Sequence, residues 1–162
     1  MKNFVIAAFA LIVLGCSTDN VLPDADQLKK DVAIIDKYLE KNGIVAVKDP
    51  SGLRLVIQDL GAGLKPDSTA HLTVKYEGRL LNGTVFDKSK LTSTGSPEPF
   101  ATPLYKLIRG WRIAFTYVGK GGKGTLYIPS TLAYGHAGAA GSPGVPGNAN
   151  LIFDIELIGF TN

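Results

Sequence analysis

The sequence predicts an α+β domain in which one antiparallel sheet curves around a short helix. From residue 53 onward, short runs of alternating apolar and polar residues are separated by turn residues, a pattern typical of antiparallel strands. Most of the 19 glycines lie in the second half of the chain, which favours tight turns over a helical bundle. Only one short stretch in this region has helical spacing, so that helix has to cover a face of the sheet.

The first residues are predicted to be an export signal. Residues 1–15 combine a charged start, an apolar run and a small-residue end, as a secretory signal peptide does. The apolar run is shorter than the roughly 20 residues that a membrane-spanning helix needs.

Cys16, the only cysteine of the chain, directly follows Gly15. This arrangement resembles the bacterial lipobox, which implies that cleavage leaves Cys16 as a lipidated N-terminus; the alternative is an ordinary signal peptide with a chance cysteine. Residues 16–23 would then be a short tether. We therefore expect a lipid-anchored protein of the bacterial cell envelope that faces the periplasm. The outer membrane is favoured over the inner membrane, and exposure on the cell surface is an open alternative.

Residues 24–50 are predicted to form an N-terminal helix and a connector. Apolar residues at 28, 32, 35 and 39 share one helical face, and Asn42-Gly43 is a typical helix stop. The apolar face suits a helix that packs on the domain or on its tether, and equally a dimerisation arm. We favour packing.

The remaining chain, residues 51–160, is predicted to be the folded domain. Asn82-Gly83 is a strong hairpin signal between two of its strands. Residues 88–99 are a polar loop, and residues 133–150 have the glycine-rich composition of an ordered loop. The strands are expected at 53–57, 70–79, 84–87, 124–129 and 151–158, and the short helix with its lead-in at 104–118.

Several function classes are excluded by composition. The net charge is only +3, and no basic run is interleaved with aromatic residues, so nucleic acid is not an expected partner. Two isolated histidines and one cysteine do not make a metal site. The glycines at 119, 121 and 124 match a dinucleotide-binding spacing, but here a helix precedes the loop and a strand follows it, the reverse of what that site requires. We expect neither metal nor cofactor.

Four segments together carry a family resemblance. They occur in order over about residues 70–158: VKYEGRLLNGTVFD (74–87), LIRGW (107–111), LYIPSTLAYG (126–135) and VPGNANLIFDIEL (145–157). This ordered set resembles the FKBP-type prolyl isomerases in their lipid-anchored bacterial form. The resemblance implies a twisted five-stranded antiparallel half-barrel around the short helix. It also implies peptidyl-prolyl cis–trans isomerase activity on Xaa-Pro-containing polypeptides, which assists the folding of exported or envelope proteins, and a macrolide as an inhibitor.

The resemblance also implies a site. Its catalytic residues would be Tyr76, Phe86, Asp87, Tyr134 and Phe153. Its substrate-binding residues would be Phe100, Leu107, Ile108, Trp111 and Val145. Many bacterial members carry a phenylalanine where this chain has Thr102, and Phe100 is the residue that would replace it.

Two further functions remain open. The same pocket would serve a lipid-anchored chaperone or binding module that captures proline-containing segments with little turnover. A purely structural envelope lipoprotein would not need a concave aromatic pocket, and the retention of Asp87, Tyr134 and Trp111 favours the enzyme.

Overall fold

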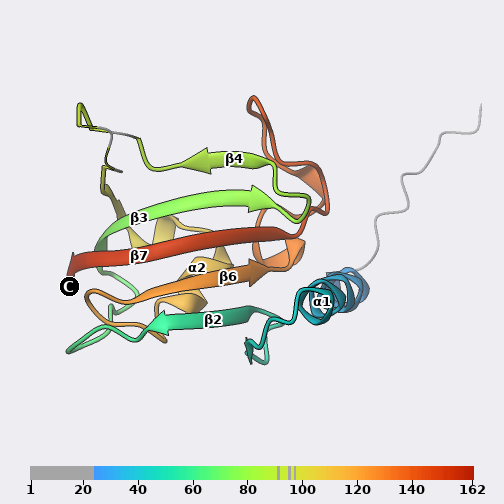
Figure 1. The fold of residues 1–162 in the computed structure, drawn as a ribbon, viewed down its shortest axis with the longest axis horizontal. Helices are drawn as coiled ribbons and strands as arrows, with labels where there is room; N and C mark the ends of the chain where they lie inside the picture. Colours follow the sequence, from blue (N-terminus) through green and yellow to red (C-terminus); the bar gives the residue numbers. More distant parts are fainter. Residues whose placement is uncertain (1–23, 91, 95, 97) are drawn as a thin grey trace, which may run out of the picture.

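The computed structural model describes residues 24–90, 92–94, 96 and 98–162. The predicted signal peptide, the predicted lipidation site at Cys16 and the predicted tether lie outside these residues. Figure 1 shows one curved sheet with a helix at its end. In chain order the elements are α1 (Asp24–Lys41), β1 (Val47–Lys48), β2 (Arg54–Asp59), β3 (His71–Leu80), β4 (Val85–Lys88), β5 (Phe100–Pro103), the 3-10 turn η1 (Leu104–Lys106), α2 (Arg109–Ala114), β6 (Lys123–Ile128), the 3-10 turns η2 (Ser130–Leu132) and η3 (Gly135–Ala137), and β7 (Leu151–Thr161).

The sheet is antiparallel throughout and has the order β1-β2-β6-β7-β3-β4. β7 pairs with the whole length of β3, so β4 and β5 lie one after the other along the other side of β3. The sheet is therefore five positions wide, plus the two-residue strand β1 at the far edge. The predicted fold class, a curved antiparallel sheet around a short helix with an added N-terminal helix, is confirmed.

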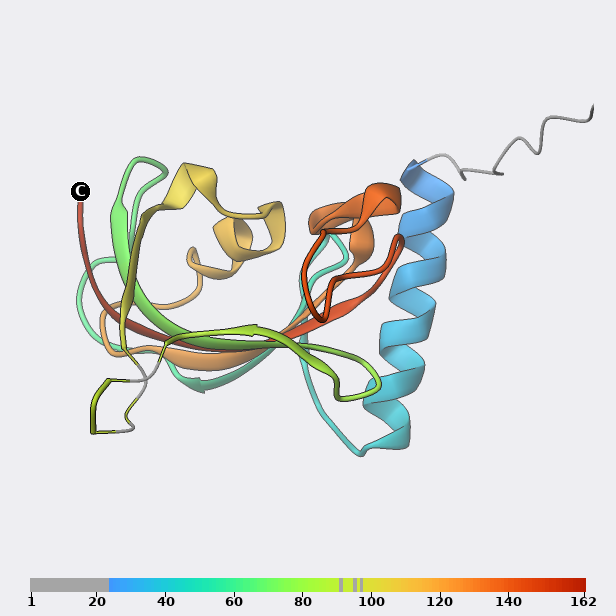
Figure 2. The same cartoon turned by 90° about the horizontal axis from the view of Figure 1, so that it is seen from above.

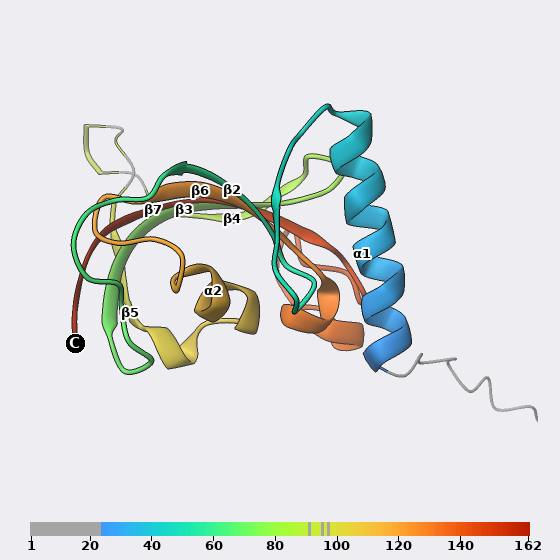
Figure 3. The same cartoon turned by 90° about the horizontal axis from the view of Figure 1, so that it is seen from below.

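The concave face of the sheet holds the main core. Figures 2 and 3 show η1 and α2 in the hollow of the curved sheet. Phe115, at the end of α2, is fully buried among apolar residues of β3, β6 and β7. Gly110 allows α2 to approach β6 closely, since a Cβ there would lie 2.5 Å from Cγ2 of Ile128. This close approach places the helix directly over the sheet.

The convex face is covered at one end by α1 (Figure 3). Ile35 and Leu39 pack with Tyr127 of β6 and Ile152 of β7 in a second apolar cluster. The prediction that this helix packs on the domain is therefore confirmed.

The buried stripe of α1 differs from the expected one. Gln27 and Asp31 are buried in line with Ile35 and Leu39, whereas the predicted residues Leu28 and Val32 are only half-buried. The reason is a polar contact to a distant turn, described below.

Two local features differ from expectation. β5 was not predicted as a strand; its pairing with β3 forms it from a segment that ends in Pro103. In the β3–β4 hairpin only Gly83 has a positive φ, of 90°. Asn82 instead accepts a hydrogen bond from the Thr84 N–H, at 3.0 Å, through its side chain.

No helix in the part of the chain that the structure describes is long and apolar enough to cross a membrane.

Candidate active site

A cavity of about 230 Å³ opens between the concave face of the sheet and the η1–α2 segment. Eight of the ten predicted site residues line it, and Lys106 is the additional lining residue. The lining residues are Tyr76, Asp87, Phe100, Lys106, Leu107, Ile108, Trp111, Tyr134 and Phe153. Strands, the helix and the loop after η2 each contribute, so the cavity exists only when the whole domain is folded.

Trp111 is the centre of the aromatic wall. Its ring meets Tyr76 edge-on with centroids 5.4 Å apart and Phe153 with centroids 5.1 Å apart. From within the core, Phe115 supports the same ring at 5.7 Å. Edge-to-face pairs at these separations are favourable by about 0.5–1.5 kcal/mol each beyond their buried area. Trp111 is 4 % exposed, so it is a fixed surface of the cavity.

The two remaining predicted residues do not line the cavity. Phe86 meets Phe153 edge-on at a centroid distance of 5.5 Å and does not line the cavity. Val145 is buried in the core cluster. Gly78 makes room for both rings, because a Cβ there would lie 2.5 Å from Cε1 of Phe153 and 2.8 Å from Cζ of Phe86.

Asp87 and Tyr76 form the polar side of the cavity. The Tyr76 hydroxyl donates a hydrogen bond of 3.0 Å to Oδ2 of Asp87. Burial raises the pKa of Tyr76, and the hydrogen bond to Asp87 and its charge raise it further. The phenol therefore stays protonated at neutral pH and keeps one carboxylate oxygen occupied, which orients the carboxylate.

Ser89, which the sequence did not single out, fixes the backbone of Tyr76 beside the strand that carries Asp87. Its Oγ accepts a hydrogen bond of 3.0 Å from the Tyr76 N–H, and its own N–H donates to the Tyr76 carbonyl at 2.9 Å. Its side chain is buried. The only signal for this role is its place two residues after Asp87, which also fits an ordinary loop serine.

Phe100 occupies the side of the cavity next to Tyr76, with ring centroids 6.1 Å apart. Thr102 lies on the same face of β5, because side chains two residues apart in a strand share a face, and it is buried beside the core. Phe100 is 44 % exposed, so it forms a rim of the cavity.

Several hydrogen-bond donors of the lining residues have no protein acceptor in the described part of the chain. These donors include the Tyr134 hydroxyl, the Ile108 backbone N–H and the buried indole N–H of Trp111. Burial and the charge of Asp87 raise the pKa of Tyr134, so its hydroxyl is a donor at neutral pH. Lys106 adds a positive charge to the same rim.

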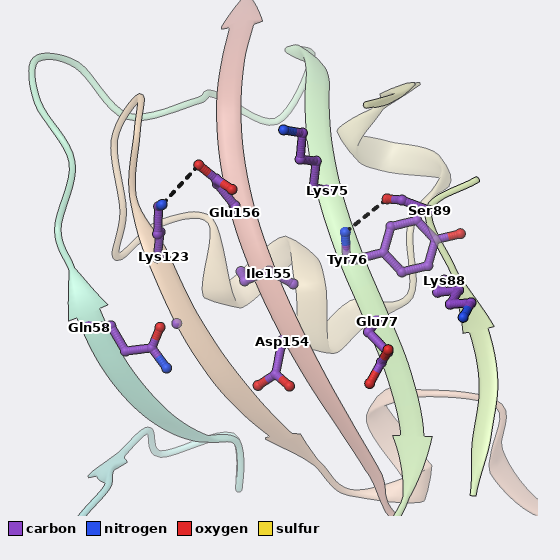
Figure 4. Close-up of a pocket in the computed structure, with 11 residues that line it drawn as sticks. Gln58, Lys75, Tyr76, Glu77, Lys88, Ser89, Lys123, Asp154, Ile155 and Glu156 are labelled. Carbon is purple, nitrogen blue, oxygen red and sulfur yellow. Dashed lines mark hydrogen bonds and ion pairs between the residues drawn. The ribbon is translucent and has the colours of Figure 1, made fainter. Parts of the chain in front are cut away.

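A larger hollow of about 360 Å³ lies on the opposite face of the sheet, with α2 behind it in Figure 4. It is lined by charged side chains of both signs, and Lys123 pairs with Glu156 there at 3.1 Å. Tyr76 borders both hollows, and it is the one aromatic residue among those that line this second hollow. Among residues 24–90, 92–94, 96 and 98–162, no three histidine or acidic side chains gather as a metal site requires.

Comparison with known proteins places these features in context. The family model described as FKBP-type peptidyl-prolyl cis-trans isomerase matches residues 63–158. The chain is 40% identical over 130 residues to the probable FKBP-type peptidyl-prolyl cis-trans isomerase FkpA of Neisseria meningitidis, covering 80% of this chain and 45% of that protein. It is also 40% identical over 131 residues to the peptidyl-prolyl cis-trans isomerase Mip of Coxiella burnetii, covering 80% of this chain and 53% of that protein. The chain therefore spans about half the length of these curated relatives.

Solved structures are similar as well. The crystal structure of FkpA from Escherichia coli aligns with a TM-score of 0.68 and 33% identity, covering 85% of this chain and 62% of that chain. A peptidyl-prolyl cis-trans isomerase from Pseudomonas syringae aligns with a TM-score of 0.69 and 30% identity, covering 87% of this chain and 98% of that chain.

Proposed function

This chain belongs to the family of FKBP-type peptidyl-prolyl cis-trans isomerases, and from that membership we propose that it accelerates rotation about Xaa-Pro bonds in polypeptides. The observation that supports the activity best is the cavity itself. Its aromatic wall is built on Trp111 and carries one oriented carboxylate, Asp87, at its side. The proposed role is the folding of exported or envelope proteins that contain proline.

The reaction that this cavity has to accelerate is a rotation about one bond. Rotation about a peptide bond passes through a twisted state without amide resonance, at a barrier of about 18–20 kcal/mol, and spontaneous exchange of an Xaa-Pro bond takes tens to hundreds of seconds. The planar amide is more polar than the twisted one. An apolar cavity that removes water from this bond therefore favours the twisted state relative to the planar one.

The cavity residues have separate proposed roles. Trp111 forms the floor under the proline ring, and the walls of Tyr76 and Phe153, with Phe86 behind them, fix and desolvate the carbonyl before proline. Leu107 and Val145 add apolar surface and packing. The free N–H of Ile108 holds a substrate carbonyl. The Tyr134 hydroxyl donates to the substrate backbone, and Asp87 supplies the polar contact to the twisting bond.

Turnover of an Xaa-Pro peptide in an isomer-coupled assay tests the proposal. Asp87→Ala and Phe86→Ala are each expected to reduce kcat/KM sharply. Asp59→Ala, which removes an exposed acid outside the cavity, and Tyr38→Ala, which removes a half-buried aromatic ring of the α1 cluster, are the matched controls. Wild-type rates in both Asp87→Ala and Phe86→Ala would overturn the assignment.

Binding without turnover is the second proposed function, and the partly exposed rings of Phe100 and Tyr134 at the cavity rim support it. It predicts suppression of client aggregation that survives Asp87→Ala. A macrolide that competes with the peptide would show that both activities use this cavity. Competition without measurable turnover in the wild-type protein would favour the binding module.

The proposed location is the bacterial cell envelope, with the domain on the periplasmic side of the outer membrane and a lipid on Cys16. The sequence of residues 1–16 supports it. Metabolic labelling with a fatty acid and membrane fractionation test this proposal. Cys16→Ser should abolish labelling and release the protein from the membrane, and labelling of the serine variant would refute it.

A further inference from the structure

A buried polar cluster joins α1 to the turn that follows β6. Asp31 of α1 and Ser130 of η2 are both 0 % exposed. Oδ2 of Asp31 accepts hydrogen bonds from the Ser130 hydroxyl at 2.6 Å and from the Ser130 N–H at 2.9 Å. Oδ1 accepts from Nε2 of Gln27 at 2.7 Å. The helix is therefore attached to the domain at one fixed point as well as by apolar packing.

Asn150 completes this cluster from the other side. Its Oδ1 also accepts from the Ser130 N–H at 3.2 Å, and its Nδ2 donates to the Asp31 carbonyl at 3.4 Å. Within the described part of the chain no lysine or arginine pairs with Asp31. A buried carboxylate held only by neutral donors is costly to bury, and its hydrogen bonds fix one geometry.

The chain that leaves this cluster enters the candidate active site. The 3-10 turn that starts at Ser130 is closed by hydrogen bonds from the Leu132 and Ala133 N–H groups, both 2.9 Å long. Tyr134, a lining residue of the cavity, follows Ala133, the residue that caps this turn. Asn150, the other member of the cluster, immediately precedes β7, which carries Phe153 of the aromatic wall.

We propose that Asp31 is a positioning residue, which sets the place of Tyr134 in the cavity by holding the η2 turn. The inference rests on the proposed isomerase function for its kinetic consequence. It makes α1 part of the active unit, because the helix fixes one cavity residue from outside the cavity. The remaining hydrogen bonds of the cluster, from Gln27 to Asp31 and between Asn150 and its two neighbours, serve the same end.

Asp31→Ala in the full chain is the direct test. Alanine removes both acceptor oxygens, so the hydrogen bonds from the Ser130 hydroxyl and from Nε2 of Gln27 are lost. We expect kcat/KM for an Xaa-Pro peptide to fall about tenfold, mainly through KM, because Tyr134 contacts the substrate backbone in both the ground state and the transition state. Leu39→Ala is the control, since it removes a buried side chain from α1 in the second apolar cluster without touching η2.

A double-mutant cycle with Tyr134→Phe separates positioning from general stability. If Asp31 acts through the Tyr134 hydroxyl, Asp31→Ala has little further effect in the Tyr134→Phe background. An undiminished effect there, an equal loss in Leu39→Ala, or wild-type kinetics in Asp31→Ala would each overturn the inference.

Amide hydrogen exchange decides the structural part without relying on turnover. Asp31→Ala should lower the protection of the Leu132 and Ala133 amides, while Leu39→Ala should leave them protected. A wild-type protein without isomerase activity would refute the proposed function, and the exchange rates would still decide the inference. Unchanged protection of both amides in Asp31→Ala would refute the inference.

Discussion

Replacing Gly78 with alanine should damage the aromatic wall of the cavity while leaving the fold in place. Gly78 lies in β3 opposite Phe153 of β7, and opposite Asp87 of β4 on its other side. The added Cβ would lie 2.5 Å from Cε1 of Phe153 and 2.8 Å from Cζ of Phe86. Carbon atoms pack at about 3.5–4.0 Å, so the ring of Phe153 has to shift by about 1 Å.

The expected loss of activity is larger than the expected loss of stability. A misplacement of about 1 Å can lower a rate about 100-fold, so kcat/KM should fall by one to two orders of magnitude. Overpacking costs roughly 1–3 kcal/mol of unfolding free energy, partly offset by about 0.4–1 kcal/mol from the stiffer unfolded chain. Isomer-coupled kinetics and thermal unfolding followed by circular dichroism measure the two effects.

Gly159→Ala is the matched control for this prediction. Gly159 lies in the neighbouring strand β7, and a Cβ there meets only Cε of Lys120, at 3.9 Å. The same chemical change therefore has room at this position, and both activity and Tm should stay near wild-type values. Unchanged kcat/KM in Gly78→Ala, or an equal loss in Gly159→Ala, would refute the reasoning.

Three other variants test the packing around the site and the attachment of α1. The hydrogen bonds from Arg54 hold the pKa of Asp36 below its ordinary value, so this pair contributes stability that is present above about pH 4 and is lost as the pH falls through the lowered pKa. Asp36→Asn should cost about 1–3 kcal/mol at pH 7 by leaving the buried guanidinium short of acceptors and should flatten the loss of stability toward pH 2 in urea titrations; an unchanged acid transition would contradict this. Gly110→Ala should lower Tm by several degrees, because its Cβ would lie 2.5 Å from Ile128, and a Tm at or above the wild-type value would show that α2 can move away. Phe100→Ala should raise KM severalfold with kcat retained, since the ring is a half-exposed rim; a change in kcat alone would place the ring at the reacting bond.

Strands with one buried face were readable from the sequence. The alternation in β3 and the apolar runs of β6 and β7 placed these strands within one to three residues of their observed bounds. The strand β5 was not readable, because its residues carry no alternation, and it exists through pairing with β3.

The polar positions were harder to read. Asp31 is a charged residue of the kind that usually lies on the solvated face of a helix. Its partners Ser130 and Asn150 are 99 and 119 residues away, so no local pattern marks it as buried. Within the cavity, the family motifs gave the aromatic residues and Asp87, but Lys106 and Ser89 carry no motif of their own. Spatial neighbours decide the role of such residues.

The division of one sheet edge between β4 and β5 has a consequence for pairing with other chains. An open sheet has two edges, and a long, flat edge is a template for such pairing. Here one edge ends in the two-residue strand β1, and the other is broken into two four-residue strands separated by the segment 89–99. Within the residues that the structure describes, each edge therefore offers only short runs of unpaired backbone groups, which disfavours the addition of a strand from a neighbouring molecule. Shortening the segment between β4 and β5 until they merge would remove this protection.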